Sequence, residues 1–398
     1  MTSGREVAED IEFRAAARAW LTENAPEHES PRSYVQAPTT FDGYHRMQTE
    51  AVARARRWQR ARSDAGFAGI SYPAELGGRG GTLQQEVIFN EESSRYRVGP
   101  GPLLMAVSMV APTLIQHGSA DQKQAHVPAI LRGDEIWAQL YSEPDAGSDL
   151  ASLRTKAERT GNAWLVNGQK VWTSGAGHAD WAILLARTDS HAPKHHGISY
   201  FLLNMRTPGV EMRPLRQMSG NYHFYEVFLT DVRLTSDAVV GKVNDGWRVA
   251  HSTMANERAM IGSALASNVD DLVDLVRKNH RSDDPLIRQE LMQIVIMDRV
   301  IGFQRRRAES IVKAGGHVGP EMAVGKLMFS HLANRAAALA LSVQGADGML
   351  AGTAAAEGGY WHDAFLNAPG LRIGGGTDEV QRNALAERVC GLPKDPRV

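Results

Sequence analysis

The hydrophobic pattern of this chain changes twice, and this double change restricts the fold more than any other feature. Up to about residue 136 the pattern indicates helices. Val7–Asn24 and Ala51–Ala65 are long and free of proline, and Gln84–Ser94 is also compatible with a helix. β-prone runs follow, and the helical spacing of apolar residues returns near Gly246 and continues to the end. We therefore expect an α+β fold in three parts: helical at 1–136, β at 137–242 and a helical bundle at 243–398.

The β part contains one strong turn signal. Asn167-Gly168 separates Trp164–Val166 from Gln169–Trp172, and both turn residues accept a positive φ, so we expect a two-residue hairpin there. Short strands at regular spacing are typical of an antiparallel barrel or sandwich. The further strands are expected at Trp181–Arg187, Ile198–Asn204, Val210–Arg213 and Phe224–Leu234.

Composition and charge exclude several classes of protein. The 398 residues carry 44 Lys and Arg against 45 Asp and Glu, a net charge of −1, which gives no electrostatic reason to bind nucleic acid or an anionic membrane. The single cysteine, Cys390, excludes a disulfide within the chain and a cysteine-based metal cluster. The N-terminal sequence MTSGREVAEDIEF lacks the apolar run of a signal peptide, so we expect a cytoplasmic protein, and no metal site is predicted.

Three stretches are rich in turn formers and hydroxyls. Ser142–Asp149 offers donors suited to an anion or the edge of a heteroaromatic ring, although most such stretches are ordinary turns. Lys170–Gly175 is a strand that ends in a tryptophan and two hydroxyls, and the tryptophan either lies beside a flat cofactor or belongs to the core. Arg372–Glu379 has three glycines before a helix that Thr377 or Asp378 would cap, and it is either a ligand loop or a flexible loop.

Glu257 interrupts the apolar stripe of a predicted helix. Ala250, Met254, Ile261 and Ala264 lie at −7, −3, +4 and +7 from it, so all five residues share one helix face. A glutamate is rarely buried without a partner. It either pairs with an arginine, points along the helix edge, or acts as a base whose pKa burial raises towards neutral pH.

Taken together, these stretches resemble the acyl-CoA dehydrogenase family over nearly the whole chain. The resemblance rests on Ser-Glu-Pro-x-Ala-Gly-Ser-Asp at 142–149, Lys-x-Trp-Thr-Ser at 170–174, Gly-Thr-Asp-Glu-Val-Gln-Arg at 376–382 and the ending Ala386–Val389. It implies an N-terminal α-helical domain, a middle antiparallel β-barrel domain and a C-terminal four-helix bundle. It also implies FAD, an acyl-CoA substrate, electron-transfer flavoprotein or an equivalent acceptor, and a dimer or homotetramer in which a neighbouring subunit completes the FAD site.

The resemblance further assigns roles to single residues. The first stretch matches positions near the flavin and the substrate, the second matches residues beside the isoalloxazine ring, and the third matches contacts to the adenosine end. The implied cofactor-binding residues are Gln139, Leu140, Tyr141, Ser142, Ser148, Trp172, Thr173, Ser174, Arg288, Gly345, Thr377, Asp378 and Glu379. The implied substrate-binding residues are Ser148, Arg258, Gly375 and Gly376.

The resemblance also implies that Glu257 is the catalytic base. Many family members carry the base in the glycine loop as Glu-Gly-Thr, whereas this chain reads Gly375-Gly376-Thr377. A second branch, similar to isovaleryl-CoA dehydrogenase, places its glutamate on a helix just before an arginine, as in Glu257-Arg258. Glu257 would remove the α-proton of the thioester while the β-hydrogen passes as hydride to flavin N5, and the Gly375 N–H would bind the thioester carbonyl.

Two departures from the family pattern concern the FAD site. Arg277–Arg288 reads RKNHRSDDPLIR and lacks the Phe-Gly of the usual Arg-x-x-Phe-Gly, which leaves Arg288 as the candidate for the pyrophosphate. The usual Gln-x-x-Gly-Gly is replaced by Ser342-Val343-Gln344-Gly345-Ala346. Two alternatives therefore stay open: a non-catalytic or partner-dependent subunit of a heteromer, and a flavin oxidase or monooxygenase on the same fold.

Overall fold

The computed structural model of the protein describes residues 7–25, 38, 40–96, 101–264, 269–313, 316 and 319–394. The chain divides into two compact units: unit 1 is Met1–His28 with Pro38–Glu257, and unit 2 is Glu29–Ala37 with Arg258–Val398. Each unit is described by itself below. Within the described residues, every helix is too short or too polar to cross a membrane.

Unit 1 begins with the helices that the sequence predicts, followed after the sheet by the first part of α6 (Gly246–Ala264). The predicted segment Ala51–Ala65 is the second half of α2, which begins earlier because the Thr40 hydroxyl accepts from the Gly43 N–H and caps it. The N-terminal helices are α1 (Ala8–Asn24), α2 (Phe41–Asp64), α3 (Leu83–Ser93), α4 (Ala111–His117) and α5 (Ala120–Arg132).

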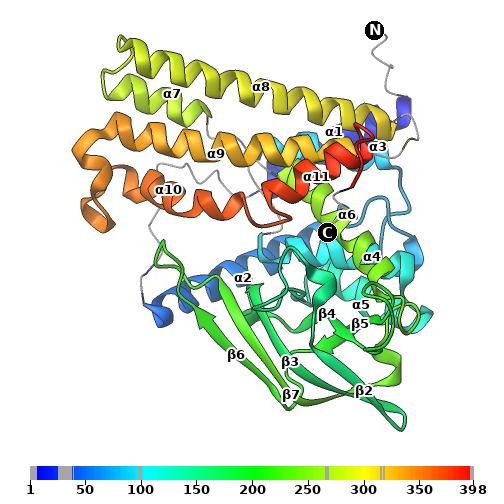
Figure 1. Ribbon diagram of the computed structural model, residues 1–398. Helices are drawn as coiled ribbons and strands as arrows, with labels where there is room; N and C mark the ends of the chain where they lie inside the picture. The colour runs from blue at the N-terminus through cyan, green and yellow to red at the C-terminus, as the bar shows by residue number, and fades with distance from the viewer. Residues whose placement is uncertain are drawn as a thin grey trace. The chain divides into compact units, whose positions relative to one another are not determined.

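Seven strands of unit 1 form one curled sheet, which Figure 1 shows. The strand order is β1-β4-β2-β3-β7-β6, and β5 pairs with β4. Most neighbours are antiparallel as expected, whereas β4 lies parallel to both β1 and β2. The strands are β1 (Trp137–Leu140), β2 (Lys156–Thr160), β3 (Ala163–Ser174), β4 (Trp181–Arg187), β5 (Ile198–Asn204), β6 (Val210–Leu215) and β7 (Phe224–Thr235).

One expectation about the sheet is wrong: Asn167-Gly168 does not turn the chain. Both residues lie inside β3, and the register against β7 shifts between Val166 and Gly168. The Asn167 side chain donates to Asp231 Oδ1 at 3.0 Å and accepts from the Asp231 N–H at 2.8 Å. At Gly168 a Cβ would lie 2.4 Å from the Thr155 hydroxyl oxygen, so only glycine fits. The pair is therefore a β-bulge, and the hairpin instead joins β2 to β3.

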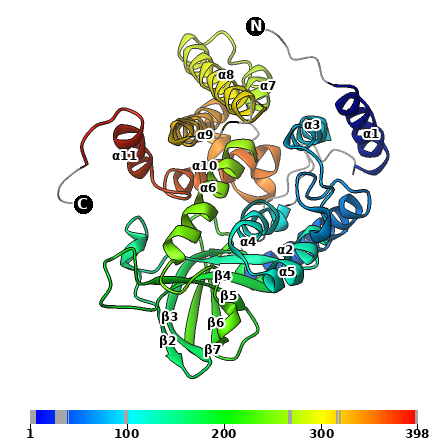
Figure 2. The same cartoon turned by 90° about the vertical axis from the view of Figure 1, so that its right-hand side faces the viewer.

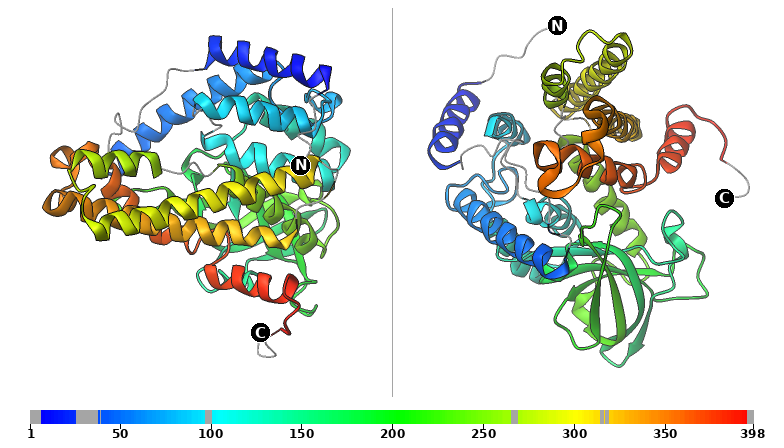
Figure 3. Two further views of the ribbon diagram at one scale, coloured as in Figure 1. Left: turned by 90° about the horizontal axis from the view of Figure 1, so that it is seen from above. Right: turned by 90° about the vertical axis from the view of Figure 1, so that its left-hand side faces the viewer.

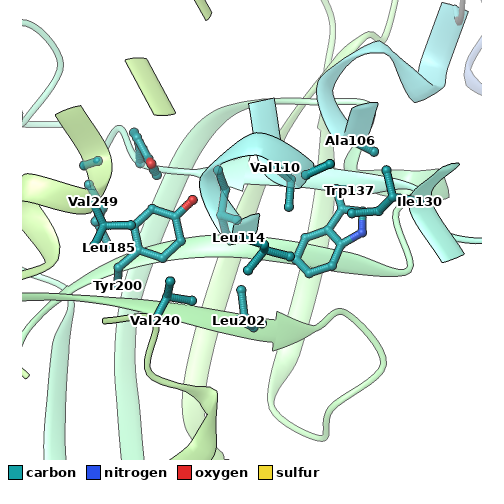
Figure 4. Close-up of a cluster of buried hydrophobic side chains, with 14 of the residues drawn as sticks. Ala106, Val110, Leu114, Ile130, Trp137, Leu185, Tyr200, Leu202, Val240 and Val249 are labelled. Carbon is teal, nitrogen blue, oxygen red and sulfur yellow. The ribbon is translucent and has the colours of Figure 1, made fainter. Parts of the chain in front are cut away.

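The sheet has an apolar core on each face, because successive side chains of a strand point to opposite faces. Ile183 and Leu185 of β4 lie in one core, and Leu184 between them lies in the other. Figure 2 shows α4 and α5 covering the sheet on the side of the first core. Figure 4 shows that core, in which Leu114 and Ile130 meet Trp137, Tyr200, Leu202 and Val249.

Unit 2 is a helical bundle, as expected. The helix α9 packs against each of the other four helices, and Figure 3 shows it running alongside α8. Buried apolar residues such as Leu272, Ile294 and Trp361 fill the interior of this bundle. By contrast, Met292, Ile296 and Phe303 of α8 are exposed. The helices are α7 (Val269–Lys278), α8 (Pro285–Lys313), α9 (Ala323–Gln344), α10 (Tyr360–Leu371) and α11 (Asp378–Arg388).

Candidate active site

The end of β3 carries an exposed tryptophan in an unusual backbone conformation. The register of β3 against β7 shifts a second time between Lys170 and Thr173, and Trp172 has a φ of 61° there. Bulges of this kind re-aim a side chain and are frequent beside active sites. Trp172 is 60% exposed, and its ring meets Phe224 edge-on with 5.9 Å between centroids. The bulge therefore presents a flat aromatic surface outside the core.

The next residue offers a polar atom without an internal partner. Thr173 is fully buried, and its Oγ1 makes no hydrogen bond to any residue that the structure describes. Buried polar atoms in folded proteins are nearly always paired, so this hydroxyl is available to a polar group of a ligand. Ser174, which follows, is half-buried. An exposed indole beside an unpaired hydroxyl suits a ligand with a flat ring and a polar edge.

The loop after β1 is tied to the same end of β3. The Val171 N–H donates to the Ser142 carbonyl at 2.9 Å, and Lys170 Nζ donates to the Tyr141 carbonyl at 3.0 Å. Lys170 Nζ also lies 2.8 Å from Glu143 Oε1. These bonds bring Ser142 beside the strand that carries Trp172, and the first two predicted stretches therefore meet in unit 1.

Glu143 and Lys170 form a buried ion pair that the sequence analysis did not predict as functional. Lys170 is fully buried, and Glu143 also accepts from the Arg154 N–H at 2.6 Å and the Thr155 N–H at 2.9 Å. Burial lowers the pKa of Lys170 to about 8 against the opposing attraction of Glu143. Burial would raise the pKa of Glu143, but Lys170 and the N–H donors lower it. The sequence did contain a signal for this pair. Lys170 lies in a predicted strand with its side chain in the core, and a buried ammonium group needs a partner.

The other predicted site residues on β1 and in the loop after it differ in how far their side chains are exposed. Gln139 is half-buried on β1, whereas Leu140 is fully buried in the core, so its side chain is not available to a ligand. Tyr141 is buried as well. Ser148 is exposed in the turn before Asp149, whose carboxylate lies 2.7 Å from Lys194 Nζ.

Glu257 lies in the part of α6 that belongs to unit 1. Its side chain is half-buried, while Ala250 on the same face is fully buried and Met254 half-buried, as the stripe predicts. Burial raises the pKa of Tyr141 well above its usual value, and the negative charge of Glu257 adds to that rise. The side chain of Arg258 lies outside the described residues.

The third stretch lies in unit 2 and shapes a glycine turn before α11. Gly375 and Gly376 have φ values of 67° and 86°, which favour glycine, and Gln381 Nε2 donates to the Gly375 carbonyl at 2.9 Å. Thr377 caps α11, as its hydroxyl accepts from the Val380 N–H at 3.2 Å. Glu379 is exposed. The turn therefore presents backbone N–H groups unobstructed by any Cβ.

Asp378 anchors this turn to α9 and is itself almost fully buried. Its carboxylate accepts from Arg372 Nε at 2.7 Å, Ser330 Oγ at 3.0 Å and Lys326 Nζ at 3.2 Å. Burial would raise the pKa of Asp378, but these partners outweigh burial and lower the pKa to about 2. Since internal donors surround the carboxylate, Asp378 fixes the shape of the turn.

Two further predicted residues are exposed in unit 2. Arg288 lies in the first turn of α8, and Gly345 follows α9 with a φ of 62°. The predicted site residues thus form two groups, one in each unit, with Trp172, Thr173 and Glu257 in unit 1 and the glycine turn in unit 2. Within the described residues, no three His, Cys, Asp or Glu side chains gather as a metal site requires.

Comparisons with known proteins agree on one family. Three family models match: "Acyl-CoA dehydrogenase, N-terminal domain" at 8–134, "middle domain" at 138–232 and "C-terminal domain" at 244–390. The acyl-CoA dehydrogenase IpdE1 of Mycolicibacterium smegmatis is 35% identical over 96% of this chain and 98% of its own length. The acyl-CoA dehydrogenase FadE34 of Mycobacterium tuberculosis is 39% identical over 84% of this chain, but the match covers 46% of FadE34, so this chain spans about half of it.

A solved structure named Tcur3481-Tcur3483 steroid ACAD superimposes with a TM-score of 0.80 and 27% identity, covering 98% of this chain and 99% of that one. The exposed indole and the unpaired Thr173 hydroxyl fit the flavin cofactor of this family. By sequence, by fold and by domain order, the chain belongs to the acyl-CoA dehydrogenase family of flavin-dependent oxidoreductases.

Proposed function

We propose that this chain is an FAD-dependent acyl-CoA dehydrogenase in which Glu257 removes the α-proton of the thioester, so that the product is the trans-2-enoyl-CoA. The observation that carries the proposal is the position of Glu257, a half-buried carboxylate on the face of α6 that also buries Ala250. Gly375 supports it, since the loop position at which many family members carry their base offers no carboxylate here.

The chemistry requires a base and a donor. The α C–H of a thioester is weakly acidic, so a carboxylate must be held near it and hydrogen-bond donors must stabilise the charge that develops on the carbonyl. Glu257 accepts the proton at a carboxylate oxygen. Gly375 and Gly376 supply N–H groups suited to that carbonyl. When bound, FAD supplies the acceptor for the β-hydrogen, which leaves with its electron pair.

We also propose which residues hold FAD. Trp172 would lie against the flavin ring, and Thr173, Ser174 and Ser142 would meet its polar edge. In unit 2, Thr377 and Glu379 at the start of α11 would contact the adenosine end, with a helix N-terminus favouring negative charge. The exposed residues Arg288 and Gly345 are the candidates for the pyrophosphate and for the part of the site near a neighbouring subunit.

Replacement of Glu257 by glutamine tests the base. E257Q keeps the shape of the side chain but cannot accept the proton, so kcat should fall by about 10²–10⁴-fold while FAD stays bound. Turnover would be measured with a set of short, long, branched and steroidal acyl-CoA substrates and a dye acceptor. FAD content per chain would be read from the visible absorbance of the purified protein.

E211Q is the matched control, since Glu211 is an exposed glutamate of β6 that pairs with Arg213. This variant should behave as the wild type in both measurements. An E257Q protein that turns over acyl-CoA at the wild-type rate would disprove the assignment of the base. Stoichiometric peroxide formation in air would instead identify an oxidase.

A second candidate function is that of a partner-dependent subunit. It is favoured by the name of the superimposed structure, which joins two components, and by the altered sequence around Gly345. Under this proposal the chain purified alone is colourless and binds FAD when a second subunit is added. A yellow, active protein that contains this chain alone would favour a homo-oligomer, which passes its electrons to electron-transfer flavoprotein or an equivalent acceptor.

A further inference from the structure

A cluster of buried hydroxyls lies one turn before Glu257 on α6, and no role assigned above uses it. Thr253 Oγ1 lies 3.1 Å from Thr113 Oγ1 of α4 and 3.2 Å from Tyr200 Oη of β5. Thr253, Thr113 and Tyr200 are all fully buried, and Figure 4 shows Tyr200 beside Val249 of α6. Because residues four apart share a helix face, Thr253 and Glu257 point to the same side of α6.

Tyr141 adds a fourth hydroxyl to this cluster. Its ring meets that of Tyr200 edge-on with 6.2 Å between centroids, and the hydroxyls of Thr253 and Tyr200 both act on its phenol. Its Oη is nevertheless buried without a hydrogen bond of good geometry to any described residue. Such an unpaired buried hydroxyl costs free energy, which a phenylalanine at this position would avoid. The phenol therefore points to a polar group that it serves.

Glu257 is the charged residue one turn from this cluster, because it follows Thr253 by four residues on α6. Its negative charge and the burial of Tyr141 both favour the protonated phenol, so at neutral pH Tyr141 carries an O–H. A neutral O–H beside a carboxylate donates a charge-assisted hydrogen bond, which is shorter and stronger than one between neutral groups. Such a bond would hold one carboxylate oxygen in place while the other accepts the proton.

We propose that the hydroxyl of Tyr141, supported by Thr253 and Tyr200, positions the Glu257 carboxylate for proton abstraction. The inference rests on the proposed function, because it assigns a partner to the proposed base. Tyr141 is a positioning residue, since it acts through Glu257 and not on the reacting atoms of the substrate.

Among the described residues, the other titratable groups near this part of α6 include Tyr200, His117, Arg248 and Asp245. Burial raises the pKa of Tyr200 above its usual value, so Tyr200 stays protonated. His117 of α4 lies 2.8 Å from Ser252 Oγ and 3.3 Å from Arg248 Nη1, and burial and Arg248 lower its pKa. Arg248 in turn pairs with Asp245. An H117Q variant separates the titration of His117 from that of Glu257.

Replacement of Tyr141 by phenylalanine removes the donor and keeps the ring. In Y141F the carboxylate loses a bond that favours its charged form, so the acid limb of the kcat profile should move up by about one pH unit. At pH 7 kcat should fall about tenfold with KM changed by less than about twofold. T253V, which removes the support of the phenol, should shift the limb in the same direction and by less. Y44F is the matched control, because Tyr44 is an equally buried tyrosine on α2.

A second readout does not depend on turnover. Urea unfolding of the wild type, Y141F, E257Q and the double variant forms a cycle, and contact between the two side chains makes the midpoint shifts non-additive. Additive shifts together with an unmoved acid limb would overturn the inference, even if E257Q is inactive. Active E257Q with non-additive shifts would overturn the proposed base and leave the contact between Tyr141 and Glu257 in place.

Discussion

At the scale of single residues, the protein uses buried lysines to hold loops that are rich in turn formers. Lys170 fixes the loop after β1 through Glu143 and the Tyr141 carbonyl, and Lys326 fixes the turn before α11 through Asp378. Moving two charges from water into the core costs free energy. Further hydrogen-bond donors to the carboxylate offset part of that cost. Both carboxylates have such donors. These pairs are therefore suited to fixing geometry rather than to raising stability.

Replacement of Lys170 by methionine tests this role in unit 1. K170M leaves Glu143 buried with only its N–H donors, so the free energy of unfolding should fall by about 3–5 kcal/mol. The double variant E143Q/K170M, which removes both charges, should regain part of that loss. Urea unfolding gives the stability, and visible absorbance gives FAD per chain, which should fall in K170M. A K170M protein as stable as the wild type would show that the pair contributes nothing.

At the scale of elements, the start of α11 is joined to α9 by one buried carboxylate. Thr377 caps the helix, and Asp378 in its first turn bonds to Ser330 and Lys326 of α9 and to Arg372 of the turn. Gly375 and Gly376 have no side chains with which to hold the turn in place. The conformation of the turn therefore depends on the ionisation of Asp378.

Replacement of Asp378 by asparagine tests this dependence on pH. The pKa of Asp378 in the folded protein, about 2, lies below the value of about 3.9 for an unperturbed aspartate. The carboxylate thus contributes stability above about pH 4, amounting to about 2–3 kcal/mol, and loses it as the pH falls towards about 2. The difference in thermal midpoint between the wild type and D378N should therefore be largest near neutral pH and shrink below about pH 4. D274N, which alters an exposed pair on α7, should show no such trend.

Much of the element structure follows from local patterns, and the exceptions have tertiary causes. The bounds of β4 and β5 agree with the sequence because both strands are buried on two faces and end at turn formers. The sequence offered Thr377 and Asp378 as candidate caps, and Thr377 is the residue that caps α11. Asn167-Gly168 was misread because Asp231 on β7, 64 residues away, bonds to the asparagine within the sheet.

The candidate site was less predictable than the fold. The stripe around Glu257 could be read from spacing, since a helix face is a local property. The partnership of Glu143 with Lys170 could not, because it links residues 27 apart through the pairing of the β1 loop with β3. The unpaired hydroxyl of Tyr141 is likewise a property of the packed core and has no local signal.

At the scale of the whole molecule, one helix exposes an apolar face. Met292, Ile296 and Phe303 of α8 are 46%, 55% and 59% exposed and lie within about 40° of one another around the helix. Apolar patches on a soluble protein often mark an interface, and closed oligomers of identical subunits are common. The stripe supports the proposal that this chain assembles into a dimer or tetramer.

A charge placed in this stripe tests the assembly. I296E should lower the molecular mass in solution to that of a smaller assembly, because an unpaired carboxylate would be buried at the interface. Light scattering during gel filtration gives the mass. Q293E adds the same charge to a neighbouring face of α8 and should keep the wild-type mass. An I296E protein of wild-type mass would exclude the stripe as the interface.

The bulge at the end of β3 also has an optical consequence. The chain has eight tryptophans, and seven of them are buried or half-buried. Trp172 is the exposed one, so it emits at the red edge of the protein's fluorescence and is the indole that a dissolved quencher reaches first. A ring stacked on Trp172 shields it from the quencher and accepts its excitation energy. The protein thus carries a built-in reporter at the surface proposed for the flavin.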